Sequence, residues 1–304
     1  MNSQELAVTQ AAEEASTVSE PRTILVRAGV GAAGRVIQRS DLTSRRLTME
    51  QSTLILVEEG RKRIRWPGGE CTASEGDALA VRAGAVVDIS NTPGRRGSYR
   101  ALWLSWSAET VSAQPTTVSA LTPGAPVTRH AALEGAFRDS FHAAFDGLRE
   151  TSALPSAIAT HRLHEVLLWL AERGFRFPQV TPPSLGLRLR GLLAEAPDAD
   201  WSMETVARRT ASSVATLRRR LAAEGTSFRD LLQDVRMSYA LALLQNTDTP
   251  VLDVAFAVGY DSASRFSARF RSRFGYSPSD IRRRAPPHPA TPASIHREPR
   301  RTRR

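Results

Sequence analysis

The sequence predicts two domains of different class: an all-β domain with two following helices and, after a linker, an all-α domain. Three observations support this prediction. Residues 21–107 contain short runs of alternating apolar and polar residues between glycines, which is typical of strands. Residues 130–173 and 184–284 repeat apolar residues every three or four positions, as amphipathic helices do. The chain has 304 residues, of which 41% are hydrophobic, and this suffices for a core in each domain.

The composition favours an anionic partner and argues against a membrane or metal protein. The formal net charge is +10, and Lys62 is the only lysine among the 41 basic residues. Cys71 is the only cysteine and no cysteine–histidine group has zinc spacing, so we expect no metal, no cofactor and a cytoplasmic location. Residues 1–20 have no apolar run, which argues against a signal peptide. No stretch approaches the ~20 apolar residues of a membrane span.

The first domain is predicted from five strand-like runs and two helical stretches. The runs are TLILVEE, RKRIRW, DALAVRA, AVVDIS and YRALWLSW. Residues 130–150 and 155–173 each carry one apolar stripe, which must be covered by the β unit, by the other helix or by a second subunit. The stripes consist of Leu133, Phe137, Phe141, Phe145 and Leu148, and of Ile158, Leu163, Val166, Leu167 and Leu170.

Proline-rich residues 175–184 interrupt the helical periodicity and mark the linker between the domains. We therefore expect a disordered N-terminus over 1–20, the first domain over 21–174 and the second over 185–284. Residues 285–304 are rich in proline and arginine and predict a disordered basic tail. Such a tail can add phosphate contacts to nucleic acid without selecting a sequence.

Two helix-turn-helix units are predicted in the second domain, because a small residue and a turn residue recur four positions apart. The small residue lets two helices cross, and the turn directs the second helix outward, where it can enter a DNA groove. Apolar anchors then hold the second helix from the inward side. The residues with these roles are Ala207, Ala211, Leu217 and Leu221 in the first unit and Ala255, Gly259, Phe266 and Phe270 in the second.

Capping residues mark where these helices begin. Ser202 and Ser213 precede the helices of the first unit, whereas Thr249, followed by Pro250, and Ser262 precede those of the second. A long helix predicted over 227–244 joins the units. The two recognition helices begin 49 residues apart. One chain can therefore place them in successive major-groove segments, about 34 Å apart.

Helical geometry of about 100° per residue sorts the side chains of the recognition helices by direction. Side chains that point away from the anchors are expected to contact bases or phosphates. The first unit is expected to select the DNA sequence. The predicted base-reading residues are Ala215, Arg218, Arg219, Ser264 and Arg265. The predicted phosphate contacts are Arg220, Arg269, Arg271 and Arg273. Phosphate contact remains an alternative for Arg219 and Arg265, and a structural ion pair for Arg220 and Arg269.

The last hundred residues resemble the AraC/XylS family of bacterial transcription regulators. The matching residues are RMSYALALLQN and PVLDVAFAVGYDSASRFSARFRSRFGYSPSDIRR, which include Gly275 and Pro278 as structural residues of the second motif. Ala211 and Ala268 depart from the family's usual glycine and basic residue. The resemblance implies a sequence-specific regulator, an activator, that binds double-stranded DNA and RNA polymerase.

The β unit resembles the cupin-like barrels that serve as sensor domains in this family. EGDALAVRAGAVV matches a cupin turn through Gly76, Asp77 and Gly84, although Arg82 stands where proline is usual. No histidine lies within the predicted strands, so a metal enzyme is not expected. The resemblance implies a small effector or regulatory protein as ligand, and a homodimer formed through the helix at 155–173.

Two other functions remain as alternatives. A DNA-repair methyl acceptor of the Ada type joins a similar DNA-binding fold to four zinc-ligand cysteines, but this chain has only Cys71. A nonspecific architectural DNA binder is compatible with the basic tail, but it has no need of two paired recognition helices. We therefore expect a regulator and no enzymatic activity.

Overall fold

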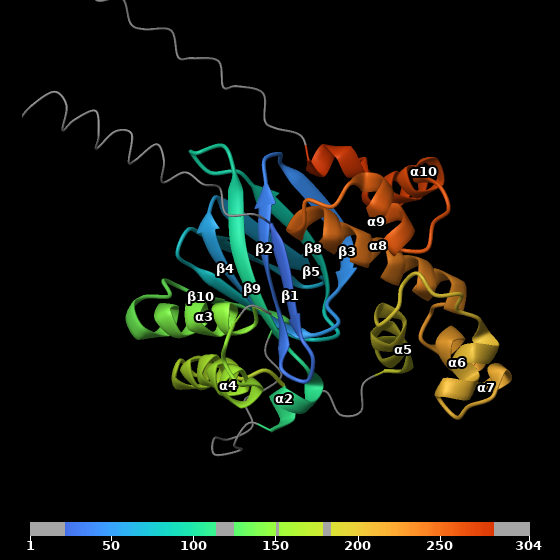
Figure 1. Cartoon of the computed structure of the whole chain (residues 1–304), viewed down its shortest axis with the longest axis horizontal. Coiled ribbons are helices and arrows are strands. Elements are labelled where there is room, and N and C mark those ends of the chain that lie inside the picture. Colours follow the sequence, from blue (N-terminus) through green and yellow to red (C-terminus); the bar gives the residue numbers. More distant parts are fainter. Residues whose placement is uncertain (1–21, 114–124, 150–151, 179–183, 283–304) are drawn as a thin grey trace, which may run out of the picture.

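A computed structural model of the chain describes residues 22–113, 125–149, 152–178 and 184–282 (Figure 1). The predicted disordered segments at 1–20 and 285–304 lie outside the described residues, as does half of the predicted linker, residues 179–183. Within the described ranges, no helix is long and apolar enough to span a membrane.

The N-terminal part is built from antiparallel strands. They are β1 Thr23–Arg27, β2 Gly31–Gln38, β3 Leu42–Thr48, β4 Ser52–Glu59, β5 Arg61–Trp66, β6 Gly69–Ser74, β7 Ala78–Val81, β8 Val86–Thr92, β9 Tyr99–Trp106 and β10 Val127–His130. One sheet has the order β1-β2-β9-β4-β7-β10 and the other the order β3-β8-β5-β6. The predicted all-β class is confirmed. Within the described residues, however, the domain consists of two sheets rather than a closed barrel, because β1 and β10 each pair on one side only.

The larger sheet is buried on both faces, which explains the continuous apolar run in β4. Successive side chains of a strand point to opposite faces. Ile55 and Val57 accordingly join the core between the two sheets, whereas Leu54 and Leu56 join the core beneath two helices. A strand covered on both faces needs apolar residues at every position.

The helices that cover the larger sheet are α3 (Gly135–Gly147) and α4 (Ser156–Glu172), and α2 (Ala108–Ser112) precedes them (Figure 1). The phenylalanine stripe of α3 is buried in this core, as predicted. Four of the five stripe residues of α4 are also buried there, and only Ile158 remains exposed. The stripe of α4 therefore packs mainly within its own chain.

The C-terminal part is helical, and one long helix connects two cores. Its elements are α5 Leu185–Ala194, α6 Met203–Arg209, α7 Val214–Ala223, α8 Phe228–Asn246, α9 Val251–Ala257, α10 Ala263–Phe274 and the 3-10 helix η1 Pro278–Ile281. The N-terminal half of α8 gives Leu231 and Val235 to the core with α5, α6 and α7. Its C-terminal half gives Leu241 and Leu244 to the core with α9 and α10. The predicted connecting helix is confirmed.

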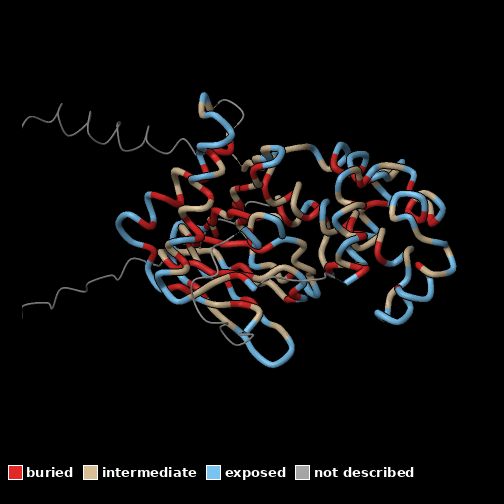
Figure 2. The backbone as a smooth tube through the Cα atoms, turned by 90° about the horizontal axis from the view of Figure 1, so that it is seen from below, coloured by how far each residue is buried: buried red, intermediate tan, exposed pale blue. Residues whose placement is uncertain are grey.

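The two domains contact each other along the second of these cores. Leu42 and Leu47 of β3 pack against the core of α9 and α10. In Figure 1, α8 lies beside β1 and β2, whereas α6 and α7 lie farther from the sheets. Helix α10 contacts β3. Figure 2 shows buried positions concentrated inside the β domain and on the inward sides of the C-terminal helices. The second unit is therefore docked on the β domain, and the first projects away from it.

Candidate nucleic-acid interface

The two helix-turn-helix units have equivalent turns. In the first, Ser212 N donates to Ala207 O at 2.9 Å, and Ala211 takes the left-handed conformation with φ of 47°. In the second, Tyr260 N donates to Ala255 O at 2.9 Å, and Gly259 has φ of 76°. The alanine at 211, where glycine is usual, thus adopts the turn at a steric cost of about 1 kcal/mol.

Serine caps set the start of both recognition helices. Ser213 accepts from Thr216 N ahead of α7, and Ser262 accepts from Arg265 N ahead of α10, as predicted. The prediction of a Thr249 cap for α9 is wrong by one position. Pro250 is the N-cap residue, and the Thr249 hydroxyl instead lies 3.0 Å from that of Thr247.

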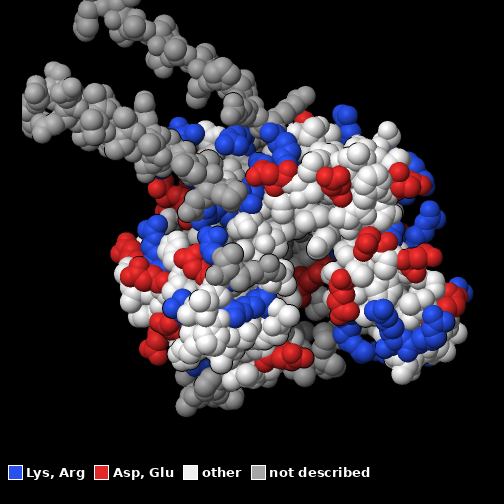
Figure 3. Space-filling model, viewed as in Figure 1, with Lys and Arg blue, Asp and Glu red and all other residues white. Residues whose placement is uncertain are grey.

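The first recognition helix, α7, presents a basic surface. Leu217 and Leu221 are buried, whereas Ala215, Arg218, Arg219 and Arg220 are exposed. None of these three guanidinium groups has a hydrogen-bond or ion-pair partner among the described residues. Figure 3 shows blue side chains gathered over α6 and α7. This surface is free to meet an anionic partner.

The second recognition helix, α10, presents a mixed surface. Phe266, Phe270 and Phe274 are buried in a row, with successive ring centroids 5.7 and 4.7 Å apart. The exposed residues of the helix include Ser264, Arg265, Ala268, Arg269 and Arg271. Gly275 ends the helix in the left-handed conformation, and Pro278 is buried in η1. The exposed side of α10 thus carries three arginines, as that of α7 does, with the short side chains of Ser264 and Ala268 among them.

Two arginines of α10 already have partners. Both carboxylate oxygens of Asp261 accept from Arg265 Nη1, at 2.8 and 3.1 Å, on the exposed surface. Arg273 differs from the other arginines of α10, because its side chain points toward α8 and the β domain. Its Nε donates to Asp234 at 2.7 Å, and its two Nη atoms donate to Arg45 O and Arg46 O at 2.7 and 2.8 Å. In this arrangement all three nitrogens of Arg273 are used.

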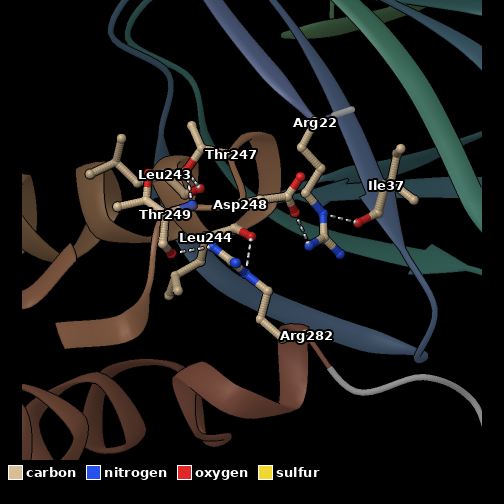
Figure 4. Close-up of polar contacts among 8 residues, drawn as sticks. All are labelled: Arg22, Ile37, Leu243, Leu244, Thr247, Asp248, Thr249 and Arg282. Atoms are coloured by element: carbon tan, nitrogen blue, oxygen red, sulfur yellow. Dashed lines mark hydrogen bonds and ion pairs between the residues drawn. The ribbon is translucent and has the colours of Figure 1, made fainter. Parts of the chain in front are cut away.

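Polar contacts also join the β domain to the loop between α8 and α9 (Figure 4). Arg22 Nη1 lies 3.2 Å from Asp248 Oδ1, and Arg22 Nε donates to Ile37 O. Burial and the neighbouring Arg282 lower the pKa of Arg22, whereas Asp248 raises it. Trp103 Nε1 donates to Asn246 at 2.8 Å, next to this cluster. Such contacts join residues far apart in sequence and have no periodic signal, so sequence analysis missed them.

A metal centre finds no support in the described ranges. Among those residues, no group of three or more histidine, cysteine, aspartate or glutamate side chains is placed to hold a metal ion. Cys71 is half-buried, and burial raises the pKa of its thiol. A thiol with a raised pKa is a poor nucleophile.

The comparison with known families identifies residues 206–284 as a helix-turn-helix domain. Over 194 residues, the chain is 28% identical to the urease operon transcriptional activator of Escherichia coli, covering 59% of this chain and 65% of the relative. It is 37% identical over 95 residues to the ornithine utilization regulator of Pseudomonas aeruginosa, covering 31% and 28% of the two chains. The matches thus cover less than two thirds of these relatives.

The comparison with solved structures extends the likeness to both domains. A single-residue variant of ToxT from Vibrio cholerae, solved in the apo form, has a TM-score of 0.59 and 12% identity, covering 84% of this chain and 97% of that one. Wild-type ToxT bound to an unsaturated fatty acid has a TM-score of 0.57 and 12% identity, covering 86% and 96%. This likeness shows that the fold, with a β-rich domain before a helical domain, is shared.

Proposed function

We propose that this protein is a sequence-specific transcription regulator of the AraC/XylS type, an activator, that binds double-stranded DNA. The match of residues 206–284 to a helix-turn-helix domain and the similarity to a transcriptional activator support this proposal. One observation carries the proposal: two helix-turn-helix units with equivalent turns both keep the outward sides of their second helices exposed. Because α8 joins the units, one chain can place α7 and α10 in successive major-groove segments.

The two units are assigned different parts of the recognition. On α7, Arg218 and Arg219 are long, exposed and unpaired among the described residues, so they can reach base edges. On α10, Ser264 is short and Arg265 is paired with Asp261, which weakens its attraction for phosphate or base. We therefore assign sequence selection chiefly to α7, and positioning on phosphates to Arg269 and Arg271 of α10 together with Arg220 of α7.

The β domain is proposed to be the sensor, with limits at 21–174, for a small effector or a regulatory protein. ToxT, which shares this two-domain fold, has been solved with an unsaturated fatty acid bound. The β domain contacts the second unit directly, through Arg22 and Asp248 (Figure 4) and through Trp103 and Asn246. An effector that shifts the β domain can therefore change how α10 is presented to DNA.

Arg219→Ala tests the assigned reading surface. We expect the variant to lose its preference at one base pair, by about 1–3 kcal/mol, because a guanidinium can donate two hydrogen bonds to guanine O6 and N7. Arg271→Ala is expected instead to weaken binding to every sequence alike and to reduce the salt dependence by about one phosphate contact. The measurement is binding to single-base variants of a site selected from random DNA by the wild-type protein.

Arg138→Ala is the matched control for charge, since Arg138 is an exposed residue of α3 in the β domain. It should change neither affinity nor preference. A uniform loss of affinity for Arg219→Ala would mean that Arg219 contacts phosphate and that the reading surface is assigned wrongly. A wild-type ratio of specific to nonspecific affinity near unity would replace the regulator by an architectural DNA binder.

A second copy of the chain and RNA polymerase are the further partners that we propose. The outer side of α4 keeps Ile158 and Leu168 exposed, at 45% and 49%, and two copies can cover these side chains against each other. Sedimentation at micromolar concentration should then show a dimer, and Leu168→Glu should shift it toward monomer. A wild-type protein that is monomeric with and without DNA would contradict this pairing.

A further inference from the structure

Asp234 lies at the junction of the two helix-turn-helix units. It is on α8 next to Val235, which belongs to the core of the first unit, and three residues before Met237, which belongs to the core of the second. Its carboxylate accepts from Arg190 of α5 through one oxygen and from Arg273 of α10 through the other. All three side chains are at least four-fifths buried. A buried carboxylate with two arginine partners holds both at fixed positions.

The two arginines belong to different units. Arg190 is on α5, and the start of α5 is bound to the end of α7: both Glu224 oxygens accept from backbone nitrogens, of Leu185 and Gly186, at 2.8 Å. Leu189 of α5 also lies in the core of the first unit. Arg273, by contrast, is in the last turn of α10 itself. The carboxylate of Asp234, on the connecting helix α8, thus links α10 to α5, and α5 is in turn bound to the end of α7.

The β domain contacts the same junction from the other side. Arg273 donates to the carbonyls of Arg45 and Arg46, where the pairing of β3 with β8 is interrupted by a bulge. Asp88 fixes this bulge by accepting from Arg46 N at 2.8 Å. Glu50, in the turn between β3 and β4, interacts electrostatically with Arg190 and Asp234. Both arginines that Asp234 holds are therefore also within reach of the sensor domain.

We propose that Asp234 is a positioning residue for DNA binding: it sets the placement of α7 relative to α10, and the β domain acts on this placement through Arg273 and Arg190. The inference rests on the proposed function as a DNA-binding regulator. Two recognition helices in successive major-groove segments must be held at one separation, about 34 Å for one turn of DNA. If the contacts of Asp234 are lost, α7 and α10 can take other separations, and the protein tolerates other spacings between the DNA segments that they contact.

The test compares two DNA sites that differ only in spacing. The first is the site selected from random DNA by the wild-type full-length chain. The second has one base pair inserted between the segments that α7 and α10 contact. Wild type should bind the second at least about tenfold more weakly, whereas for Asp234→Ala the loss should shrink to about threefold or less. Asp234→Asn, which keeps one acceptor oxygen but loses the other and the charge, should fall between them.

Asp253→Ala is the matched control, because it makes the same change in net charge at an exposed aspartate of α9. It should retain the wild-type ratio between the two sites, even if the added charge raises affinity for both. The ratio, unlike affinity alone, does not respond to a general change in charge or in folded fraction.

Three results would overturn the inference. If Asp234→Ala and Asp234→Asn keep the wild-type ratio, Asp234 does not set the spacing. If both variants lose affinity equally on the two sites while the melting midpoint falls, Asp234 only stabilises the domain. If the wild-type protein itself prefers no DNA sequence, the proposed function is wrong, and so is the inference. Binding measurements on wild type alone distinguish this case from the other two.

Discussion

Phe270→Ala is expected to lower the free energy of unfolding of the C-terminal domain by about 3–5 kcal/mol and to abolish specific DNA binding. Phe270 is fully buried, between Phe266 and Phe274 on the inward side of α10, and its ring also meets that of Tyr276. Its removal leaves a cavity where α10 is held on α8 and α9. A loss of this size is comparable to a large part of the stability of a typical domain.

Chemical unfolding followed by circular dichroism measures the loss, and DNA binding is measured below the unfolding midpoint. Arg271→Ala is the control, since it changes the next residue of the same helix but on the exposed side. It should leave the free energy of unfolding within about 0.5 kcal/mol of wild type. If Phe270→Ala unfolds like wild type, then α10 is not held by the phenylalanine row.

The helical domain could be predicted from the sequence because its signals are local. The phenylalanines at 266, 270 and 274 lie four residues apart and are buried, as one helix face requires. The two turns were found from the spacing of Ala207 to Ala211 and of Ala255 to Gly259, and both form the same backbone hydrogen bond. Even Ala211, a departure from glycine, occupies the left-handed turn position.

The β domain was less predictable, because its contacts join residues distant in sequence. Alternation indicated strands, but it did not show that they divide into two sheets. Nor did it show which positions of the run RKRIRW face inward. Lys62, the only lysine, lies between the sheets, where Nζ donates to Asn91 at 2.7 Å and lies 5.1 Å from the ring centroid of Tyr99. Burial lowers its pKa to about 7.

The role of Arg273 illustrates what helical geometry alone leaves out. As one of several arginines on α10, it was predicted to contact phosphate together with Arg269 and Arg271. The structure instead directs its side chain to Asp234 and to two carbonyls of β3, which are 227 and 228 residues away in sequence. Position on a helix indicates the direction of a side chain, but the neighbouring domain decides what it meets.

Glu50 is a buried titratable residue at the contact between the domains. It lies beside a cavity of about 170 Å³ between the β domain and α5, which Trp106, Leu187 and Arg188 also line. Burial raises the pKa of Glu50 from its ordinary value of 4.5 to about 7, with Arg190 lowering it and Asp234 raising it. Near neutral pH, the folded protein therefore retains a proton that the unfolded chain has already lost.

Glu50→Gln is expected to have a higher free energy of unfolding than wild type at high pH. The difference between variant and wild type should be up to about 3 kcal/mol larger at pH 8 than at pH 4. In wild type the unfolded chain binds fewer protons than the folded protein between pH 4.5 and about 7, so the free energy of unfolding falls as pH rises through this range. Above pH 7 the folded state holds a buried carboxylate, and the full loss persists. Glutamine has the same shape without the titrating proton, so the variant should lack this component of the pH dependence.

The measurement is urea unfolding of wild type and Glu50→Gln at intervals from pH 4 to pH 8. The stability difference between them should grow with pH in favour of the variant and level off above about pH 7.5. Glu75→Gln, at an exposed residue of the β domain, is the control and should show no such growth. A stability difference that does not change with pH would mean that the pKa of Glu50 in the folded protein lies near its ordinary value. Attraction to Arg190 would then offset the effect of burial on that pKa.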